Sequence, residues 1–283
     1  LKVDTPSQIG LDLGGNSRVR GVLKVRSKSQ LDLDISTRVG GGLCVADAGE
    51  IKFTPRGATI DGEGSLTSND QVTVDSLKDA TTGPITIDAS GQVKFDKTRN
   101  STVNGPVSVT AAGQVKLDEL EAVSTGPITV DGKGQVDIVS GRDTTVDGAI
   151  EVTDAGGQIT LDLAATEISE GVSLANNSQV KLSLTDGSTI GSTVDVDTES
   201  QVKVDLTDSQ IEDDLDIVTN SQVELDLTDS QIDGTVTIES QSQVDVRLKD
   251  SSIAGDLSIS TPSQISVSDC SAVEGTVSPQ RAC

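Results

Sequence analysis

A unit of 21 residues is repeated in tandem in the C-terminal half of the chain. Residues 200–220 read SQVKVDLTDSQIEDDLDIVTN, and residues 221–241 read SQVELDLTDSQIDGTVTIESQ. Each unit alternates apolar and polar residues, reaches a Thr-Asp-Ser turn cluster, and continues through a lone Ile into a second alternating run. Alternation with a period of two is typical of a β-strand with one buried face. A fixed repeat of this length predicts a solenoid in which each unit forms one coil.

The same unit can be followed through the whole chain. Its opening position recurs thirteen times, at steps of 20 to 23 residues, at Gln8, Gln30, Glu50, Gln71, Gln92, Gln114, Gln135, Gln158, Gln179, Gln201, Gln222, Gln243 and Gln264. The next residue is aliphatic in every unit, and the residue two places further on is always apolar. We predict about 13 coils with three short strands each. Coils stacked about 4.8 Å apart would form a rod about 60 Å long.

Composition agrees with a narrow, aliphatic interior. The chain has two Phe and no Trp, Tyr, His or Met, whereas a large globular core normally uses aromatic side chains. The repeat is lost near the C-terminus. We therefore predict one solenoid domain over residues 1–276 and a cap or tail over residues 277–283. Because the chain begins at Leu1 rather than Met, we expect a processed product or a cut fragment.

Coils of about 21 residues with three strands resemble the right-handed parallel β-helix, as in secreted bacterial adhesin passengers and pectate-lyase-like proteins. The resemblance covers nearly the whole chain and concerns the architecture rather than one family. It implies an all-β, single-domain β-solenoid, secreted or exposed at the cell surface. Architecture alone does not define an activity.

Charge restricts the partners of the chain. The formal net charge of −24 disfavours nucleic acid and anionic membrane surfaces. No run of 18 apolar residues is present, so we predict no membrane span. Residues 1–42 hold seven basic and four acidic side chains, a net of +3, whereas residues 185–275 hold 20 acidic and three basic, a net of −17. The two ends of the rod therefore differ in charge.

Outward-facing polar rows suggest a structural role and one metal hypothesis. The Gln row can form a ladder of amide hydrogen bonds along the rod. Outward Asp side chains follow Lys two residues earlier, which predicts the ion pairs Lys94–Asp96, Lys116–Asp118 and Lys203–Asp205.

An acidic cluster offers oxygen ligands for Ca²⁺: Asp195, Asp197, Glu212, Asp213, Asp214, Asp216 and Asp233. The alternative is a solvated acidic face; no other cofactor is predicted.

Catalysis is not predicted. Without His, a Ser-His-Asp arrangement and a His general base are excluded. Carboxylate-only glycosidase chemistry needs two acids across a sugar cleft, and no pair stands out among so many Asp residues. Arg247 beside Asp245 is the lone candidate for polysaccharide chemistry.

Three cysteines and two glycosylation sequons remain. Cys270 and Cys283 are close enough in sequence for a disulfide that ties down the C-terminus, with unpaired thiols as the alternative. Cys44 alternates with apolar neighbours and should face outward. Asn100-Ser101-Thr102 and Asn176-Asn177-Ser178 match the N-glycosylation sequon.

From these features we predict an extracellular structural protein that assembles head to tail into a fibre or surface layer. A contact of this kind that does not close gives an open filament. Arg18, Arg20 and Arg26 at one end would meet Asp269 and Glu274 at the other. The alternative is a monomeric adhesin stalk whose acidic face binds Ca²⁺ or a basic surface partner. A polysaccharide-active enzyme and a halophile surface protein are further alternatives.

Overall fold

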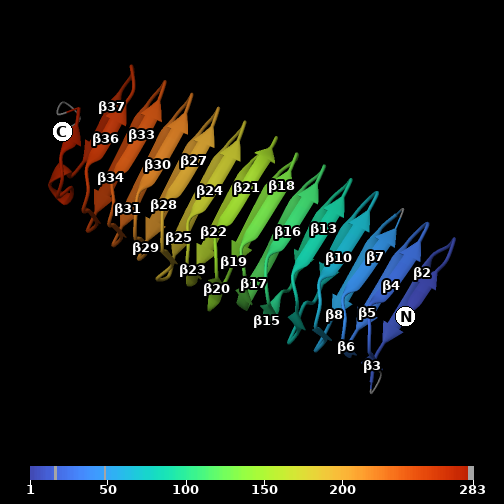
Figure 1. Ribbon diagram of the computed structural model, residues 1–283. Helices are drawn as coiled ribbons and strands as arrows, with labels where there is room; N and C mark the ends of the chain where they lie inside the picture. The colour runs from blue at the N-terminus through green and yellow to red at the C-terminus, as the bar shows by residue number, and fades with distance from the viewer. Residues whose placement is uncertain (16–17, 48, 280–283) are drawn as a thin grey trace.

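The computed structural model describes residues 1–15, 18–47 and 49–279. They form one β-solenoid, with the N-terminus at one end of a rod and the C-terminus at the other (Figure 1). Every strand pairs in parallel with the equivalent strand of the neighbouring coil. The predicted all-β parallel solenoid of about 13 coils is confirmed, while its right-handed sense stays a prediction.

The first strand of each coil begins one residue after the Gln or Glu at the opening position of the repeat. Thirteen strands form this first-strand series: β2 (Ile9–Leu13), β5 (Leu31–Ile35), β8 (Ile51–Pro55), β11 (Val72–Asp75), β14 (Val93–Asp96), β17 (Val115–Thr125), β19 (Val136–Ser140), β22 (Ile159–Ala164), β25 (Val180–Thr185), β28 (Val202–Thr207), β31 (Val223–Thr228), β34 (Val244–Lys249) and β37 (Ile265–Ser268). The register places Val202, Val223 and Val244 above one another. Identical positions of the repeat therefore stack.

The second-strand series is short and centres on the lone Ile of the repeat. Its strands are β3 (Arg18–Val19), β6 (Arg38–Val39), β9 (Thr59–Ile60), β12 (Thr81–Thr82), β15 (Arg99–Val103), β20 (Thr144–Val146), β23 (Thr166–Ile168), β26 (Thr189–Ile190), β29 (Gln210–Ile211), β32 (Gln231–Ile232) and β35 (Ser252–Ile253). In one coil, β17 runs through both series and pairs with strands of each. The two series thereby join into a 24-stranded sheet.

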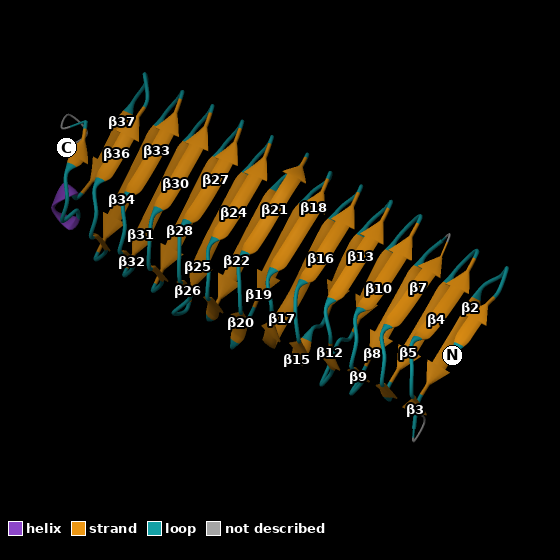
Figure 2. Cartoon of the chain, in the orientation of Figure 1, coloured by secondary structure: helices purple, strands orange, loops and turns teal. Residues whose placement is uncertain are grey.

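The third-strand series forms a separate 14-stranded sheet. Its strands are β1 (Lys2–Asp4), β4 (Leu23–Ser27), β7 (Leu43–Asp47), β10 (Gly64–Ser68), β13 (Ile85–Ala89), β16 (Val107–Ala111), β18 (Ile128–Gly132), β21 (Ile150–Ala155), β24 (Val172–Asn176), β27 (Val194–Thr198), β30 (Leu215–Thr219), β33 (Val236–Ser240), β36 (Leu257–Ser260) and β38 (Val277–Ser278). Figure 2 shows these strands stacked along the rod.

The core is a stack of aliphatic columns inside the coils. Alternate residues of each strand point inward, so that Val202, Val204 and Leu206 of β28 are each no more than 2% exposed. Phe53 and Phe95 occupy the second apolar column and are also buried. Full burial of one Val, Leu or Ile side chain contributes about 1.5–3 kcal/mol. The repeated columns therefore provide most of the driving force for folding.

The C-terminal boundary differs from the prediction that the solenoid ends at residue 276. Val277 and Ser278 form β38, which pairs with β36 and continues the third-strand sheet. The pattern is lost earlier in sequence because a 3-10 helix, η1 (Cys270–Ala272), replaces the usual turn. Residues 280–283 of the predicted tail lie outside the described residues.

A row of hydroxyl groups ties coils together at the corner after the third strand in both end portions of the rod, and Ala or Gly takes this position in the middle coils. Thr219 Oγ1 donates a hydrogen bond to the carbonyl of Ser200 in the preceding coil, and it accepts one from the Ser221 amide at 3.2 Å. Ser240 repeats both contacts one coil further on. Buried polar groups at tight corners need such partners. This corner hydroxyl row links neighbouring coils as the sheets do.

Candidate functional site

The Gln row forms the predicted ladder in part of the rod. Gln179 Nε2 donates to Gln201 Oε1 at 2.8 Å, and Gln201 Nε2 donates to Gln222 Oε1 at 2.9 Å. In the middle coils, Gln135 instead donates to Asp137 of its own coil. The row is therefore a structural device that uses whichever acceptor is near.

The predicted ion pairs are confirmed on the outer face of the first-strand series. The Lys nitrogen and Asp oxygen are 3.1 Å apart in Lys94–Asp96, 2.8 Å apart in Lys116–Asp118 and 3.2 Å apart in Lys203–Asp205. All are partly solvated, so each contributes at most about 1 kcal/mol. Their main effect is to reduce repulsion within the Asp rows.

Arg247, the lone catalytic candidate, lies in an ion-pair network. Its Nη1 contacts Glu224 at 2.6 Å and Asp226 at 3.0 Å, and its Nη2 contacts Asp245. The hydrogen bond from Arg247 is the main cause of a lowered pKa at Glu224. Glu224 Oε1 also lies 3.7 Å from Lys203 Nζ. The guanidinium is already engaged by three carboxylates, which favours a structural role.

Three of the residues predicted to bind Ca²⁺ lie on the outer face of the third-strand sheet. Asp195 and Asp197 belong to β27, and Asp216 of β30 is the register partner of Asp195. The pKa of Asp195 is raised, first by burial and then by the neighbouring Asp216 charge. Repulsion between these two carboxylates therefore remains uncompensated in the protein alone.

The other four predicted ligands lie at the adjoining corner, where three of them accept hydrogen bonds from different donors. Asp213 accepts a hydrogen bond from Thr193 at 3.2 Å, and Asp214 accepts one from the Thr235 amide at 2.6 Å. Asp233 accepts from Gln210 at 2.7 Å, and Glu212 is exposed. Among the described residues, no group of three or more acidic or Cys side chains is arranged to hold a metal ion. Ca²⁺ binding stays a prediction.

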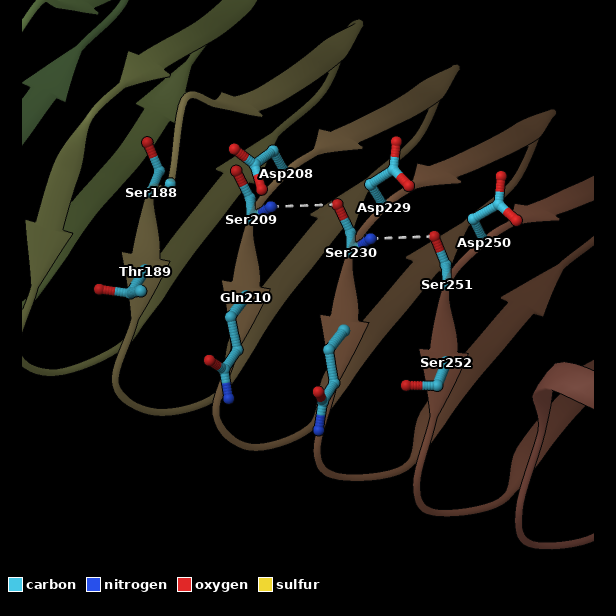
Figure 3. A pocket seen from close by; sticks show the side chains of 12 residues that line it. Ser188, Thr189, Asp208, Ser209, Gln210, Asp229, Ser230, Asp250, Ser251 and Ser252 are labelled. Atoms are coloured by element: carbon cyan, nitrogen blue, oxygen red, sulfur yellow. Dashed lines mark hydrogen bonds between the residues drawn. The ribbon is translucent and has the colours of Figure 1, made fainter.

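A groove of about 560 Å³ runs along the corner between the first and second strands (Figure 3). Asp208, Asp229 and Asp250 line one side of it, one per coil. All three have left-handed backbones, with φ of 50°, 49° and 52°, a conformation that Asp tolerates better than most residues. No hydrogen bond or ion pair engages these three carboxylates within the described part of the chain. The groove thus carries a row of carboxyl groups without protein partners among the described residues.

Buried and half-buried hydroxyls form the floor beneath this acidic groove. Ser230 Oγ accepts a hydrogen bond from the Ser209 amide at 3.1 Å, and Ser251 Oγ accepts one from the Ser230 amide at 3.0 Å (Figure 3). The sequence predicts Thr-Asp-Ser as turn residues but does not predict the groove. Its available signal was the recurrence of Asp at one fixed position of consecutive repeats.

The two end faces of the rod differ from its interior coils. Strands β1, β2 and β3 each pair on one side, and the apolar side chains between them are only partly buried. At the other end, Ile265, Val267, Ala272 and Val277 are likewise partly buried. Equivalent residues within the rod are almost fully buried. Each end therefore presents strand edges and incompletely covered apolar columns.

The predicted interface residues lie at opposite ends, as sequence analysis expected. Arg18, Arg20 and Arg26 belong to the first two coils and are exposed, and Asp269 and Glu274 are exposed in the last coil. The structure does not bring the two groups together within one molecule. Their contact between molecules stays a prediction.

The cysteines lie in different parts of the rod. Cys44 is a free thiol, half-buried on the outer face of β7, as predicted. Cys270 begins η1 and is disulfide-bonded. The partner predicted for it, Cys283, lies outside the described residues.

Comparisons with protein-family models, with curated proteins and with solved structures give no match to this chain. The fold itself defines the class, which is that of the parallel β-solenoids. Among the described residues there is no helix of the length and apolarity that crossing a bilayer requires.

Proposed function

We propose that this protein is an extracellular structural protein whose rods stack head to tail into a filament or surface layer. The observation that carries the proposal is the correspondence between the two end faces. One end is mildly basic and the other strongly acidic, and both expose strand edges. Open β-edges are templates for pairing with another chain.

The strand register indicates how two ends would meet. A continuous column of paired residues runs through the second-strand series from Val19 to Ile253, and a further bridge joins Ile253 to Val273. Arg20 directly follows the first member of this column, and Glu274 directly follows the last. A second rod stacked in the same register would therefore place Arg20 beside Glu274.

Apolar columns match in the same arrangement. Ile9 and Leu11 of β2 occupy the positions of the repeat that Ile265 and Val267 occupy in β37. Continued stacking would cover both partly exposed pairs and supply the edges of the first-strand and second-strand series with backbone partners. In the third-strand sheet, β38 of one rod and β1 of the next would fall in the same layer, so one of these two terminal strands must leave the sheet when rods join. Burial of the apolar surface of both pairs contributes about 25 cal/mol per Å². Burial of more than about 40 Å² therefore contributes more free energy than a single surface ion pair, which is worth at most about 1 kcal/mol.

Electron microscopy across a range of protein concentrations tests the proposal. We expect filaments with an axial repeat of about 60 Å, the length of one rod. Arg20→Glu and Glu274→Arg should each raise the concentration needed for filaments by roughly fivefold, since like charges then meet at a cost of about 1 kcal/mol. The double variant should restore assembly.

Arg142→Glu provides a matched control, because Arg142 is an exposed residue between β19 and β20, within the rod. It changes the net charge by the same amount as Arg20→Glu and should leave assembly unchanged. Isolated rods at every concentration would contradict the proposal. Equal effects of Arg20→Glu and Arg142→Glu would contradict the Arg20–Glu274 contact.

The acidic groove favours a second candidate, a stalk that binds Ca²⁺ or a basic partner. It rests on the free carboxylates of Asp208, Asp229 and Asp250. We expect Ca²⁺ to raise the melting temperature in this case, and the triple Asn variant at these positions to abolish the rise. An unchanged melting temperature would contradict Ca²⁺ binding in this groove.

A further inference from the structure

The two N-glycosylation sequons have opposite environments in the folded chain. Asn100 belongs to β15 and is exposed, whereas Asn176 at the end of β24 is 7% exposed. No third Asn of the sequence is followed by Ser or Thr at the required spacing. The structure can therefore separate the two candidates by the space and the hydrogen bonds around each amide nitrogen.

We propose that Asn100 is the acceptor of an N-linked oligosaccharide and that Asn176 is not. The backbone of Asn100 is left-handed, with φ of 48°, which lifts the residue out of the regular strand. Its Nδ2 donates one hydrogen bond, to Asp79 Oδ1 at 3.3 Å. The second N–H is free for substitution, so the link to a sugar preserves the contact with Asp79.

Asn176 has no such spare N–H. Its Nδ2 donates to the carbonyl of Gly157 at 2.7 Å and to the carbonyl of Gln179 at 3.1 Å. A glycosylated amide keeps a single N–H, so one of these carbonyls would lose its partner inside the corner. The buried site also has no room for a sugar ring. A chain modified at Asn176 would not complete this corner of the solenoid.

The transfer requires a lipid-linked oligosaccharide pyrophosphate as co-substrate and the transferase of a secretory compartment. Nδ2 of Asn100 forms a bond to the anomeric carbon of the first sugar, and the bond from that carbon to the pyrophosphate oxygen breaks. The pyrophosphate departs with the bonding electrons, and one Nδ2 proton passes to a base.

The inference requires an extracellular route but does not require filament formation. Asn100 lies between the two ends of the rod (Figure 1), so a glycan there leaves both end faces open.

Secretion of the chain from a eukaryotic host, with a signal peptide supplied, tests this inference independently of assembly. The folded, secreted protein is treated with a glycosidase that converts each glycosylated Asn to Asp, and its peptides are analysed by mass spectrometry. We expect conversion at Asn100 and none at Asn176. Thr102→Val should abolish the glycan, because it removes the sequon hydroxyl from an outward position of β15 and leaves Asn100 in place.

Asn176→Gln is the companion variant and should leave the glycan unchanged. An unmodified Asn100 in the secreted protein would overturn the inference. So would conversion at Asn176 in protein that melts like the wild type. Filament formation is measured separately on the same samples, so its failure is distinguishable from failure of this inference.

Discussion

At the residue scale, the corner hydroxyl row explains why small polar residues are buried in an otherwise aliphatic interior. Each needs a proton to donate to the preceding coil, and Ser, Thr and Asn supply one. Asp47 occupies this row between Ser27 and Ser68 in register. Its Oδ1 accepts from the Gly49 amide, but its Oδ2 is buried without a hydrogen-bond partner among the described residues. Ser27 and Ser68 each donate a hydrogen bond to a backbone carbonyl from this row, whereas the only hydrogen bond that the Asp47 side chain makes among the described residues is one that it accepts.

We expect Asp47→Asn to stabilise the protein by about 1–3 kcal/mol, because it replaces an unpaired buried oxygen with a donor group. Asn176 shows that an amide fits this row, since it donates to Gly157. The reverse substitution, Asn176→Asp, should destabilise by a similar amount. Thermal melting of both variants checks the expectation. A loss of stability in Asp47→Asn would show that the orphan oxygen has a favourable role.

At the scale of the element, strands were easier to predict than corners. Alternation of apolar and polar residues, as around Val202 and Val223, predicted the first strand of every coil. One buried face requires a period of two. The paired charges of Lys203 and Asp205 followed from the same alternation. The corner hydroxyl row was not predicted, because a buried Thr and a solvated turn Thr look alike in sequence. The acidic groove was missed for a similar reason, since its shape depends on the left-handed backbone of each Asp.

Two carboxylates on neighbouring sheets should give opposite pH effects. The folded-state pKa of Glu224 is lowered, so its stabilising contribution is present above the usual Glu range and is lost as pH falls through the folded pKa. The folded-state pKa of Asp195 is raised, so its ionisation destabilises the fold as pH rises above the usual Asp range. At pH 7 we expect Glu224→Gln to lower the melting temperature and Asp195→Asn to raise it.

Each of these variants removes one negative charge, so they control for the net charge of the molecule. Both differences should shrink at about pH 3, where carboxylates become protonated. Melting curves at the two pH values give the comparison. Shifts of the same sign at pH 7 would mean that net charge outweighs the local environments.

At the scale of the whole molecule, stability is a sum over coils and the contacts between neighbouring coils. Each coil contacts only the coil before it and the coil after it in register. A coil is therefore a unit that can be removed without disturbing distant parts. This property distinguishes the solenoid from a globular domain, in which removal of 21 residues would open the shared core.

Deletion of residues 222–242 tests this modularity, because it removes one repeat and joins Ser221 to Gln243. The Ser-Gln junction of the repeat is kept. New neighbours would be Lys203 beside Asp245 and Asp205 beside Arg247, which replace the lost contacts of Arg247 with Glu224 and Asp226. We expect a folded rod about 4.8 Å shorter, with a slightly lower melting temperature, measured by circular dichroism and small-angle scattering.

A half-coil deletion is the matched control. Removal of residues 222–232 joins Ser221 to Asp233 and takes out a first and a second strand while leaving their third strand. The remaining segment cannot complete a coil, so every later column is displaced from its partner. We expect loss of cooperative melting, even though fewer residues are removed than in the full deletion. If both deletions melted alike, register between coils would not determine stability, and stacking of separate rods in the same register would lose its physical basis.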